Sequence, residues 1–353
     1  MVRVGLVGFG LAGRVFHAPL ISSVEGLELA AVVERSSDNA AQRYPGITTY
    51  RSVDELLSDA SIKLVVVATP NASHFSIAMQ ALEAAKNVVV DKPVALSSDE
   101  IRQLSELAGG IGLQLFPFHN RRLDNDFQTL RKVMDDHALG RLVHFDSNFD
   151  RWRPGLTRRP WKEDQDQGGL LFDIGTHLVD QILVVFGLPA SISAETRRER
   201  DGDGSSDSFT IRLQYMTGFT ATLSSNLLSS LARPRFHLRG TRGNFWKWGL
   251  DPQEDALSKI TKIDDSEWGK EPSDRWGMLS VGVDGDPVVT PVPSELGDYR
   301  RFYAGVRDAL LGTPAKELAT AVDAWRGARI LEWAKQSSDE RREIECDWSG
   351  EPA

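Results

Sequence analysis

An aspartate and a histidine stand four residues apart in the stretch GGLLFDIGTHLVDQILVVFG, as Asp173 and His177. If the segment from Asp173 to Phe186 is helical, the two side chains share one face and reach one substrate hydroxyl together. Removal of a hydride from a carbinol carbon requires the hydroxyl proton to leave as well, and a neutral imidazole suits this task because its pKa lies near neutrality. The spacing therefore predicts His177 as the general acid and base, while Asp173 binds the substrate or orients the imidazole.

A lysine in the turn Asp91-Lys92-Pro93 is the third residue of this chemistry. The turn follows an apolar strand, and we expect Lys92 to stabilise a developing alkoxide and to hold the cofactor. One other interpretation of Asp173 and His177 stays open. A helical Asp–His pair is often a local surface pair. A metal site would need a third ligand that the sequence does not offer, so we predict no metal.

A glycine-rich turn follows the first apolar strand, in VRVGLVGFGLAGRVFHAP near the N-terminus. Gly8 permits the turn, Gly10 lets the backbone approach a pyrophosphate, and Gly13 lets the next helix pack against the strand. The N-terminus of that helix would offer unpaired N–H groups to the phosphates. The pattern predicts a dinucleotide-binding unit whose turn also brings three other residues to the cofactor: Phe9, Leu11 and Ala12.

Two residues at the end of the second predicted strand, LELAAVVER, bear on the choice of cofactor. Glu34 stands where an acidic residue hydrogen-bonds the adenosine ribose. Because its carboxylate would repel a 2′-phosphate, we favour NAD. The adjacent Arg35 could stack on the adenine or bind a 2′-phosphate, and this leaves NADP open.

Helices and strands then alternate as far as LQLFPFHNRR, and this alternation predicts a parallel sheet with crossover helices. Ligands of such sheets bind beyond the carboxyl ends of the strands. We place the boundary near Asn120, so residues 1–120 form a Rossmann dinucleotide-binding domain. The remaining predicted cofactor-binding residues lie at that edge: Thr69, Pro70, Asn71, His74, Asp91, Lys92 and Asn120.

Residues 121–353 show short, separated strands with period-two alternation, which predicts a largely antiparallel sheet in a second α/β domain. Residues 264–298 are rich in Gly, Pro, Asp and Ser and predict an irregular excursion with one short strand pair. Two helices are expected near the C-terminal end, in residues 295–312 and 320–337. The fold class is therefore α/β.

The loop RWRPGLTRRPWKEDQDQGG, residues 151–169, leads directly to the Asp173 segment. Arginines interleaved with tryptophans occur in nucleic-acid-binding loops, but this loop is short and turns acidic. We interpret it as a wall of the substrate cleft, with a solvated surface loop as the alternative. Predicted substrate contacts beyond the catalytic residues are Asn120, Arg121, Arg153 and Trp161; for Asn120 and Arg121 the alternative is packing at the domain boundary.

The composition of the 353-residue chain narrows the class of protein. A formal net charge of -9 argues against a general nucleic-acid binder. The longest apolar runs are far shorter than the ~20 residues of a membrane helix, and the N-terminus lacks a secretory pattern. The single cysteine, Cys346, cannot form an intramolecular disulfide. We expect a cytoplasmic protein of two domains, with no nucleic-acid or membrane partner.

Four motifs, GFGLAGRVFHAP, VATPNASH, DKPVALS and GGLLFDIGTHLVDQ, occur in an order that resembles the Gfo/Idh/MocA family of NAD(P)-dependent oxidoreductases. The likeness covers nearly the whole chain. FGLAGRVFHAPL and FHNRRLDNDF are similar to bacterial members of the scyllo-inositol dehydrogenase type. The resemblance implies a sugar or cyclitol substrate. It also implies a C-terminal domain whose open sheet forms the subunit interface, and hence a homodimer or larger homo-oligomer.

The chain departs from its relatives at two positions. Asp91 replaces the usual acid of the family's EKP motif, and Glu34 stands where the subgroup carries small hydroxyl residues, which puts an inherited NADP preference in doubt. Two rival functions stay open: a redox-neutral glycosidase that uses bound NAD, and a regulator that senses NAD(P) without turnover. Retention of Lys92, Asp173 and His177 argues against the regulator.

Overall fold

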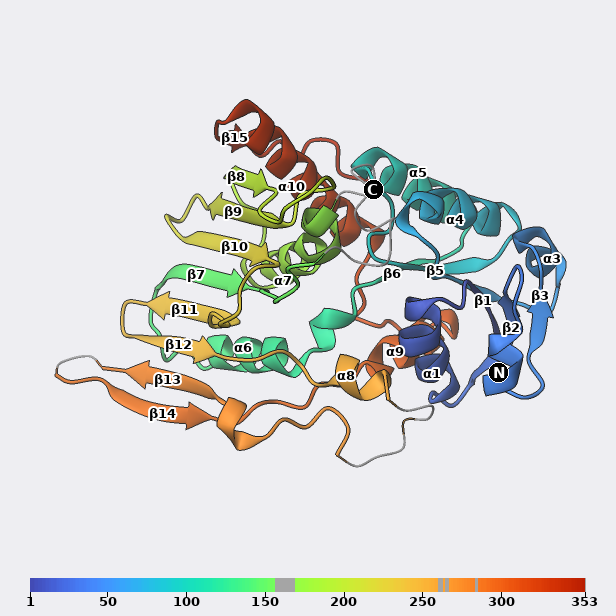
Figure 1. Ribbon diagram of the computed structural model, residues 1–353, viewed down its shortest axis with the longest axis horizontal. Coiled ribbons are helices and arrows are strands. Elements are labelled where there is room, and N and C mark those ends of the chain that lie inside the picture. The colour runs from blue at the N-terminus through green and yellow to red at the C-terminus, as the bar shows by residue number, and fades with distance from the viewer. Residues whose placement is uncertain (156–168, 260–262, 264–266, 283–284, 353) are drawn as a thin grey trace.

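Two sheets lie side by side in the computed structural model, which describes residues 1–155, 169–259, 263, 267–282 and 285–352 (Figure 1). Within these residues the first sheet has six strands in the order β3-β2-β1-β4-β5-β6, and every neighbouring pair is parallel. The predicted Rossmann sheet is thus confirmed. Its strands are β1 (Val2–Val7), β2 (Leu27–Val33), β3 (Thr48–Tyr50), β4 (Leu64–Val67), β5 (Asn87–Asp91) and β6 (Leu115–Phe118).

The central strands of this sheet are apolar on both faces. All four residues of β4 are buried, as are Val88, Val89 and Val90 of β5. Such runs are typical of a parallel sheet that helices cover on both sides. The crossover helices are α1 (Ala18–Ser22), which continues a π-helical turn at Gly13–His17, α2 (Asn39–Arg43), α3 (Val53–Ser58), α4 (His74–Glu83) and α5 (Ser98–Gly110).

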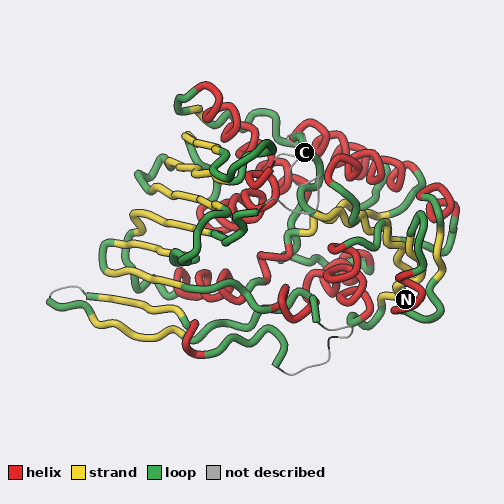
Figure 2. The backbone as a smooth tube through the Cα atoms, viewed as in Figure 1, coloured by secondary structure: helices red, strands yellow, loops and turns green. Residues whose placement is uncertain are grey.

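The second sheet is mixed and mostly antiparallel. Within the described residues it has nine strands in the order β14-β13-β12-β11-β7-β10-β9-β8-β15, and only β7 and β10 pair in parallel. Figure 2 shows its strands as a group of yellow segments apart from those of the first sheet. The predicted strand pair in residues 264–298 is the hairpin β13–β14. The strands are β7 (Leu142–Asn148), β8 (Ser191–Arg197), β9 (Ser208–Gln214), β10 (Thr220–Asn226), β11 (Phe236–Gly240), β12 (Gly243–Lys247), β13 (Gly277–Val281), β14 (Val288–Val292) and β15 (Ile344–Glu345).

Helices pack against one face of the second sheet. In β9 the buried residues Phe209, Ile211 and Leu213 alternate with exposed Arg212 and Gln214, so only one face of this strand belongs to the core. The helices that contribute to this core are α6 (Asn125–Asp135), α7 (Thr176–Phe186) and α10 (Ala321–Glu340). Two other helices, α8 (Gln253–Leu257) and α9 (Arg300–Leu310), place their buried apolar residues in a cluster of the first sheet.

The last two long helices return to the first sheet. Phe302 and Val306 of α9 belong to the apolar cluster that also contains β1 and α1 residues. The first sheet has a second apolar cluster, which contains Trp325 of α10, whereas Ile330 and Leu331 of the same helix belong to the core of the second sheet. Helix α10 therefore joins the two cores, and the division into residues 1–120 and 121–353 stays a prediction. In the described part of the chain, no helix has the length and apolar character needed to cross a membrane.

Candidate active site

A cavity of about 810 Å³ opens where the strands of the first sheet end. It is lined by the segments that follow β1, β4, β5 and β6, as expected for a ligand of a parallel sheet. The cavity reaches helix α7 and the turn before it, so it joins the two parts of the chain. The predicted site residues on its wall are Phe9, Gly10, Leu11, Ala12, Thr69, Pro70, Asn71, Asp91, Lys92, Asn120, Arg121, Asp173 and His177.

The glycine turn has the geometry that a dinucleotide needs. Gly8 has a φ of +98°, and a Cβ there would lie 2.7 Å from the carbonyl oxygen of Ala68. A Cβ at Gly13 would collide with the carbonyl oxygen of Gly8. At Gly10, by contrast, a Cβ would meet nothing within 4 Å, because this residue faces the open cavity. The backbone at Gly10 is thus accessible to a pyrophosphate, and Gly8 and Gly13 shape the turn from behind.

His74 joins the two loops that carry Thr69 and Lys92. Its Nδ1 lies 2.7 Å from the carbonyl oxygen of Pro93, and its Nε2 lies 2.8 Å from that of Thr69. The side chain is buried and is not on the cavity wall. His74 therefore has the geometry of a residue that positions both loops, and the predicted contact with the cofactor stays a prediction.

Lys92 and Asp173 form an ion pair across the cavity. The Lys92 Nζ donates to the Asp173 Oδ1 at 2.7 Å and to the main-chain oxygen of Asp173, also at 2.7 Å. Asp173 lies in a π-helical turn, Leu171–Gly175, that runs directly into α7, so the expected helix is present but begins with a wider turn. Burial raises the pKa of Asp91, but His17 and Lys92 outweigh this effect and hold that pKa below its usual value.

His177 is 5 % exposed and lies at the start of α7, one turn beyond Asp173. Burial, and then the positive charges of Lys92 and Arg121, hold the pKa of His177 well below its usual value, although Asp173 acts in the opposite direction. The imidazole is therefore neutral at pH 7. Its Nδ1 is buried and has no hydrogen-bond partner within the described residues, which leaves Nε2 as the nitrogen that can meet a substrate.

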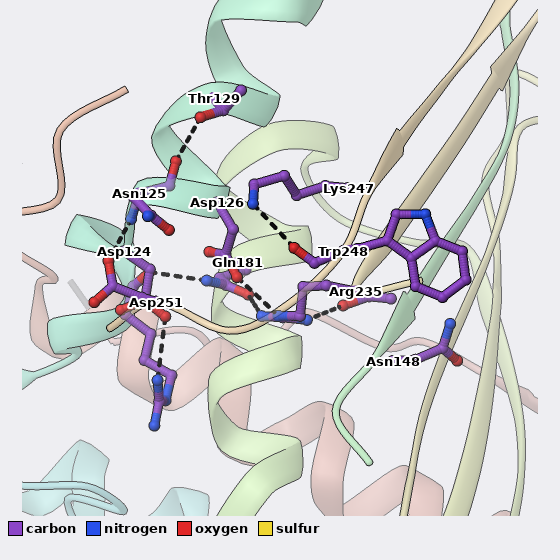
Figure 3. Close-up of polar contacts among 12 residues, drawn as sticks. Asp124, Asn125, Asp126, Thr129, Asn148, Gln181, Arg235, Lys247, Trp248 and Asp251 are labelled. Atoms are coloured by element: carbon purple, nitrogen blue, oxygen red, sulfur yellow. Dashed lines mark hydrogen bonds and ion pairs between the residues drawn. The ribbon is translucent and has the colours of Figure 1, made fainter. Parts of the chain in front are cut away.

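A buried network lies behind Arg121. The guanidinium of Arg121 contacts Asp124 at 3.2 Å and Glu254 at 2.6 Å, and its main-chain oxygen accepts a hydrogen bond from Gln181 at 2.8 Å. Gln181 in turn accepts from Arg235 at 2.6 Å. Figure 3 shows Asp124, Gln181 and Arg235 of this network gathered between α6, α7 and the second sheet. The network fixes Arg121 at the cavity wall.

Glu34 points into its own loop. One carboxylate oxygen accepts a hydrogen bond from the Ser37 hydroxyl and the other from the Ala40 N–H, both at 2.7 Å. Glu34 is 6 % exposed and, like the exposed Arg35, does not line the cavity. The predicted contacts of Glu34 and Arg35 with the adenosine end therefore stay predictions. The residues that do line this side are Arg14, Asn39, Gln42 and Arg43.

The sequence analysis missed two other charged residues of the cavity wall, Arg151 and Glu254. Arg151 belongs to the loop that we interpreted as a cleft wall, but we chose Arg153 and Trp161 from it. Arg153 is exposed and away from the wall, and Trp161 lies outside the described residues. Among the described residues, no cluster of three or more His, Cys, Asp or Glu side chains could hold a metal ion.

A glycine turn that opens into the same cavity as a lysine–carboxylate pair and a neutral histidine defines the class of a nicotinamide-dependent oxidoreductase. Residues 2–119 match the model of the oxidoreductase family with an NAD-binding Rossmann fold, and residues 127–246 match that of the GFO/IDH/MocA C-terminal domain. The chain belongs to the GFO/IDH/MocA family and is a dehydrogenase or reductase.

Curated relatives and solved structures align with almost the full chain. The oxidoreductase YdgJ of Escherichia coli, itself uncharacterized, is 38% identical over 88% of this chain and 89% of its own. The scyllo-inositol 2-dehydrogenase (NADP(+)) IolW of Bacillus subtilis is 30% identical over 97% of this chain and 95% of its own. A putative oxidoreductase of Yersinia pestis, YPO2259, has a TM-score of 0.92 at 38% identity, with 98% of this chain and 97% of that one covered.

Proposed function

We propose that this enzyme transfers a hydride between a nicotinamide cofactor and a carbinol or ketone carbon of a sugar or cyclitol. The observation that carries the proposal is the Lys92–Asp173 ion pair beside a neutral His177, in one cavity with the glycine turn. The resemblance to a scyllo-inositol 2-dehydrogenase supports a cyclitol-like substrate.

The residues of the turn fit a dinucleotide. Gly10 exposes its backbone to the cavity. The helical turn beyond it begins with a hydrogen bond from the Arg14 N–H to the carbonyl oxygen of Gly10, at 3.0 Å. Thr69, Pro70, Asn71 and the main chain at Asp91 would hold the nicotinamide half. When bound, the nicotinamide accepts the hydride from an alcohol or returns it to a ketone.

His177 acts as the general base in alcohol oxidation and as the general acid in ketone reduction. In the neutral tautomer that carries its proton on Nδ1, Nε2 is free to accept the proton of the substrate hydroxyl. Two of the three N–H groups of the Lys92 ammonium are used by Asp173. The third remains for the substrate oxygen, where it would stabilise the charge that develops as the proton leaves.

The test is the absorbance change at 340 nm when the purified protein meets inositols, aldoses and sugar acids with NAD or NADP. Reduction of cofactor with one polyol, lost in His177→Ala while cofactor binding by calorimetry is intact, is the expected result. Unchanged turnover in His177→Ala would overturn the catalytic assignment. Consumption of a glycoside without net NADH would favour the glycosidase, and cofactor binding without any turnover would favour the sensor.

We also propose a cytoplasmic homo-oligomer formed through the second sheet. The alternation of exposed Arg212 and Gln214 with buried residues in β9 supports one sheet face that helices do not cover. Burial raises the pKa of the only cysteine, Cys346, to about 12, which lowers the reactivity of this thiol at neutral pH. Size-exclusion chromatography with light scattering measures the number of subunits, and a monomer would contradict the interface.

A further inference from the structure

The Arg151 side chain lies on the cavity wall, and among the described residues its guanidinium makes no hydrogen bond. Its backbone is fixed because the Arg151 N–H donates to the carbonyl oxygen of Asn226 at 3.0 Å. The side chain is 18% exposed. The carboxylate of Glu254 lies 4.0 Å from the guanidinium. A guanidinium has five N–H donors, so Arg151 presents donors to whatever occupies the cavity.

Glu254 stands beside Arg151 and is held in place from the other side. It accepts a hydrogen bond from Arg121 at 2.6 Å, and Asp124 anchors Arg121 from behind at 3.2 Å. Arg121 and Arg151 pull the pKa of Glu254 below its usual value, although burial acts in the opposite direction. Glu254 is therefore a fixed carboxylate, and it has lone pairs left for further donors.

The ring of Phe149 contacts the guanidinium groups of both Arg121 and Arg151. The guanidinium carbon of Arg121 lies 4.9 Å from the ring centroid, and that of Arg151 lies 5.0 Å from it. Such cation–π contacts restrict the guanidinium groups without using their N–H donors. The donors of Arg151 and the acceptor oxygens of Glu254 are thus held next to each other.

Apart from Arg14 and Arg43 on the side near Glu34, the positive and negative charges of the cavity wall are equal in number. The cations are Lys92, Arg121 and Arg151, the carboxylates are Asp91, Asp173 and Glu254, and His177 is neutral. A phosphate placed at Arg151 would stand against the Glu254 carboxylate and be repelled by it. A hydroxyl has no such conflict, since it can accept a hydrogen bond from Arg151 and donate one to Glu254.

We propose that Arg151 and Glu254 form a subsite that hydrogen-bonds those hydroxyl groups of the substrate that are distant from the oxidised carbon. This subsite selects uncharged polyols over phosphorylated ones. The inference deepens the proposed function and rests on it for the identity of the reacting carbon. The subsite itself concerns binding, so it can be tested separately from turnover.

The test compares Arg151→Gln and Glu254→Gln with wild type in the full-length protein. Arg102→Gln and Glu106→Gln, from an exposed 2.8 Å ion pair on α5, are the matched controls. The probes are myo-inositol, glucose and glucose 6-phosphate. For each, cofactor reduction gives kcat and KM, and calorimetry on the cofactor-saturated protein gives Kd. Arg151→Lys, which keeps the cation, replaces Arg151→Gln if circular dichroism shows that the latter does not fold.

Each site variant should raise the KM and Kd of an uncharged probe about tenfold, the usual effect of losing a hydrogen bond to a charged group, with kcat within about threefold. Glu254→Gln should also lower the Kd and KM of glucose 6-phosphate, relative to those of glucose, about tenfold, because the repelling charge is gone. Unchanged Kd values in both site variants, wild-type preference for the phosphorylated probe, or no binding of any uncharged probe would each overturn the subsite. If wild type binds the uncharged probes without turnover, and the site variants lose this binding, the subsite is sustained and the proposed function is contradicted.

Discussion

Replacement of Arg235 by methionine tests the buried network behind the cavity. Arg235 is less than 2% exposed and donates to Asp126 at 3.2 Å, Ser147 at 2.8 Å and Gln181 at 2.6 Å. Its guanidinium carbon also lies 4.2 Å from the centroid of the Phe236 ring. Methionine fills a similar volume but offers no donor, so Arg235→Met leaves a buried carboxylate, a hydroxyl and an amide oxygen without this partner.

The dominant cost is the charge of Asp126, which has a fully buried side chain. Removing one partner of a buried ion pair costs about 3–5 kcal/mol because the other charge stays desolvated and unpaired. The double variant Arg235→Met/Asp126→Asn removes that charge as well and should recover about 1–3 kcal/mol of the loss. Arg239→Met, at an exposed position of the same strand β11, should stay within about 0.5 kcal/mol of wild type.

Urea unfolding followed by tryptophan fluorescence measures these differences in the free energy of unfolding. The reasoning is refuted if Arg235→Met lies within about 1 kcal/mol of wild type. It is also refuted if the double variant is no more stable than the single one, because the penalty would then not come from the unpaired carboxylate.

Three further predictions concern the cavity. Lys92→Met should lower kcat by about 10²–10³ and leave the cofactor Kd within a few-fold of wild type, as measured by steady-state kinetics and calorimetry. An unchanged kcat with cofactor binding weakened to that extent would show that Lys92 only binds the cofactor. Because the pKa of His177 is depressed, kcat/KM for alcohol oxidation should stay level through about pH 6.5 and fall only at lower pH, and a midpoint at 6.5 would contradict the burial effect. Gly13→Ala should destabilise the protein by about 2 kcal/mol, since its Cβ meets backbone, whereas Gly10→Ala should keep its Tm and weaken NAD binding; equal Tm losses would contradict this distinction.

The first sheet could be predicted because its signals are local. Strands β1, β2, β4, β5 and β6 carry apolar runs such as LVVV at Leu64–Val67, whereas the edge strand β3, with the sequence TTY, carries none. The return of α9 and α10 to that sheet could not be predicted in the same way. The apolar face of α10 shows that the helix is buried, but periodicity does not say which sheet covers Trp325 and which covers Ile330.

The place of Lys92 and His177 on the cavity wall was predictable because a single motif carries each residue, and their catalytic roles stay predictions. Glu254 was missed because α8 is a single short helix whose sequence carries no motif, and only the tertiary fold brings it to Arg121, 133 residues away. The position of Glu34 was read from the strand end, but the direction of its carboxylate depends on the Ser37 hydroxyl and the Ala40 N–H, which compete for it locally.

Helix α10 has a thermodynamic consequence for the whole chain. If either sheet unfolded, one side of this helix would lose its apolar contacts. Each sheet with its helices therefore stabilises the other, and the two halves of the chain should unfold cooperatively. Lys92 belongs to one half and Asp173 to the other. Their alignment is therefore maintained by a helix that contributes no reactive group of its own.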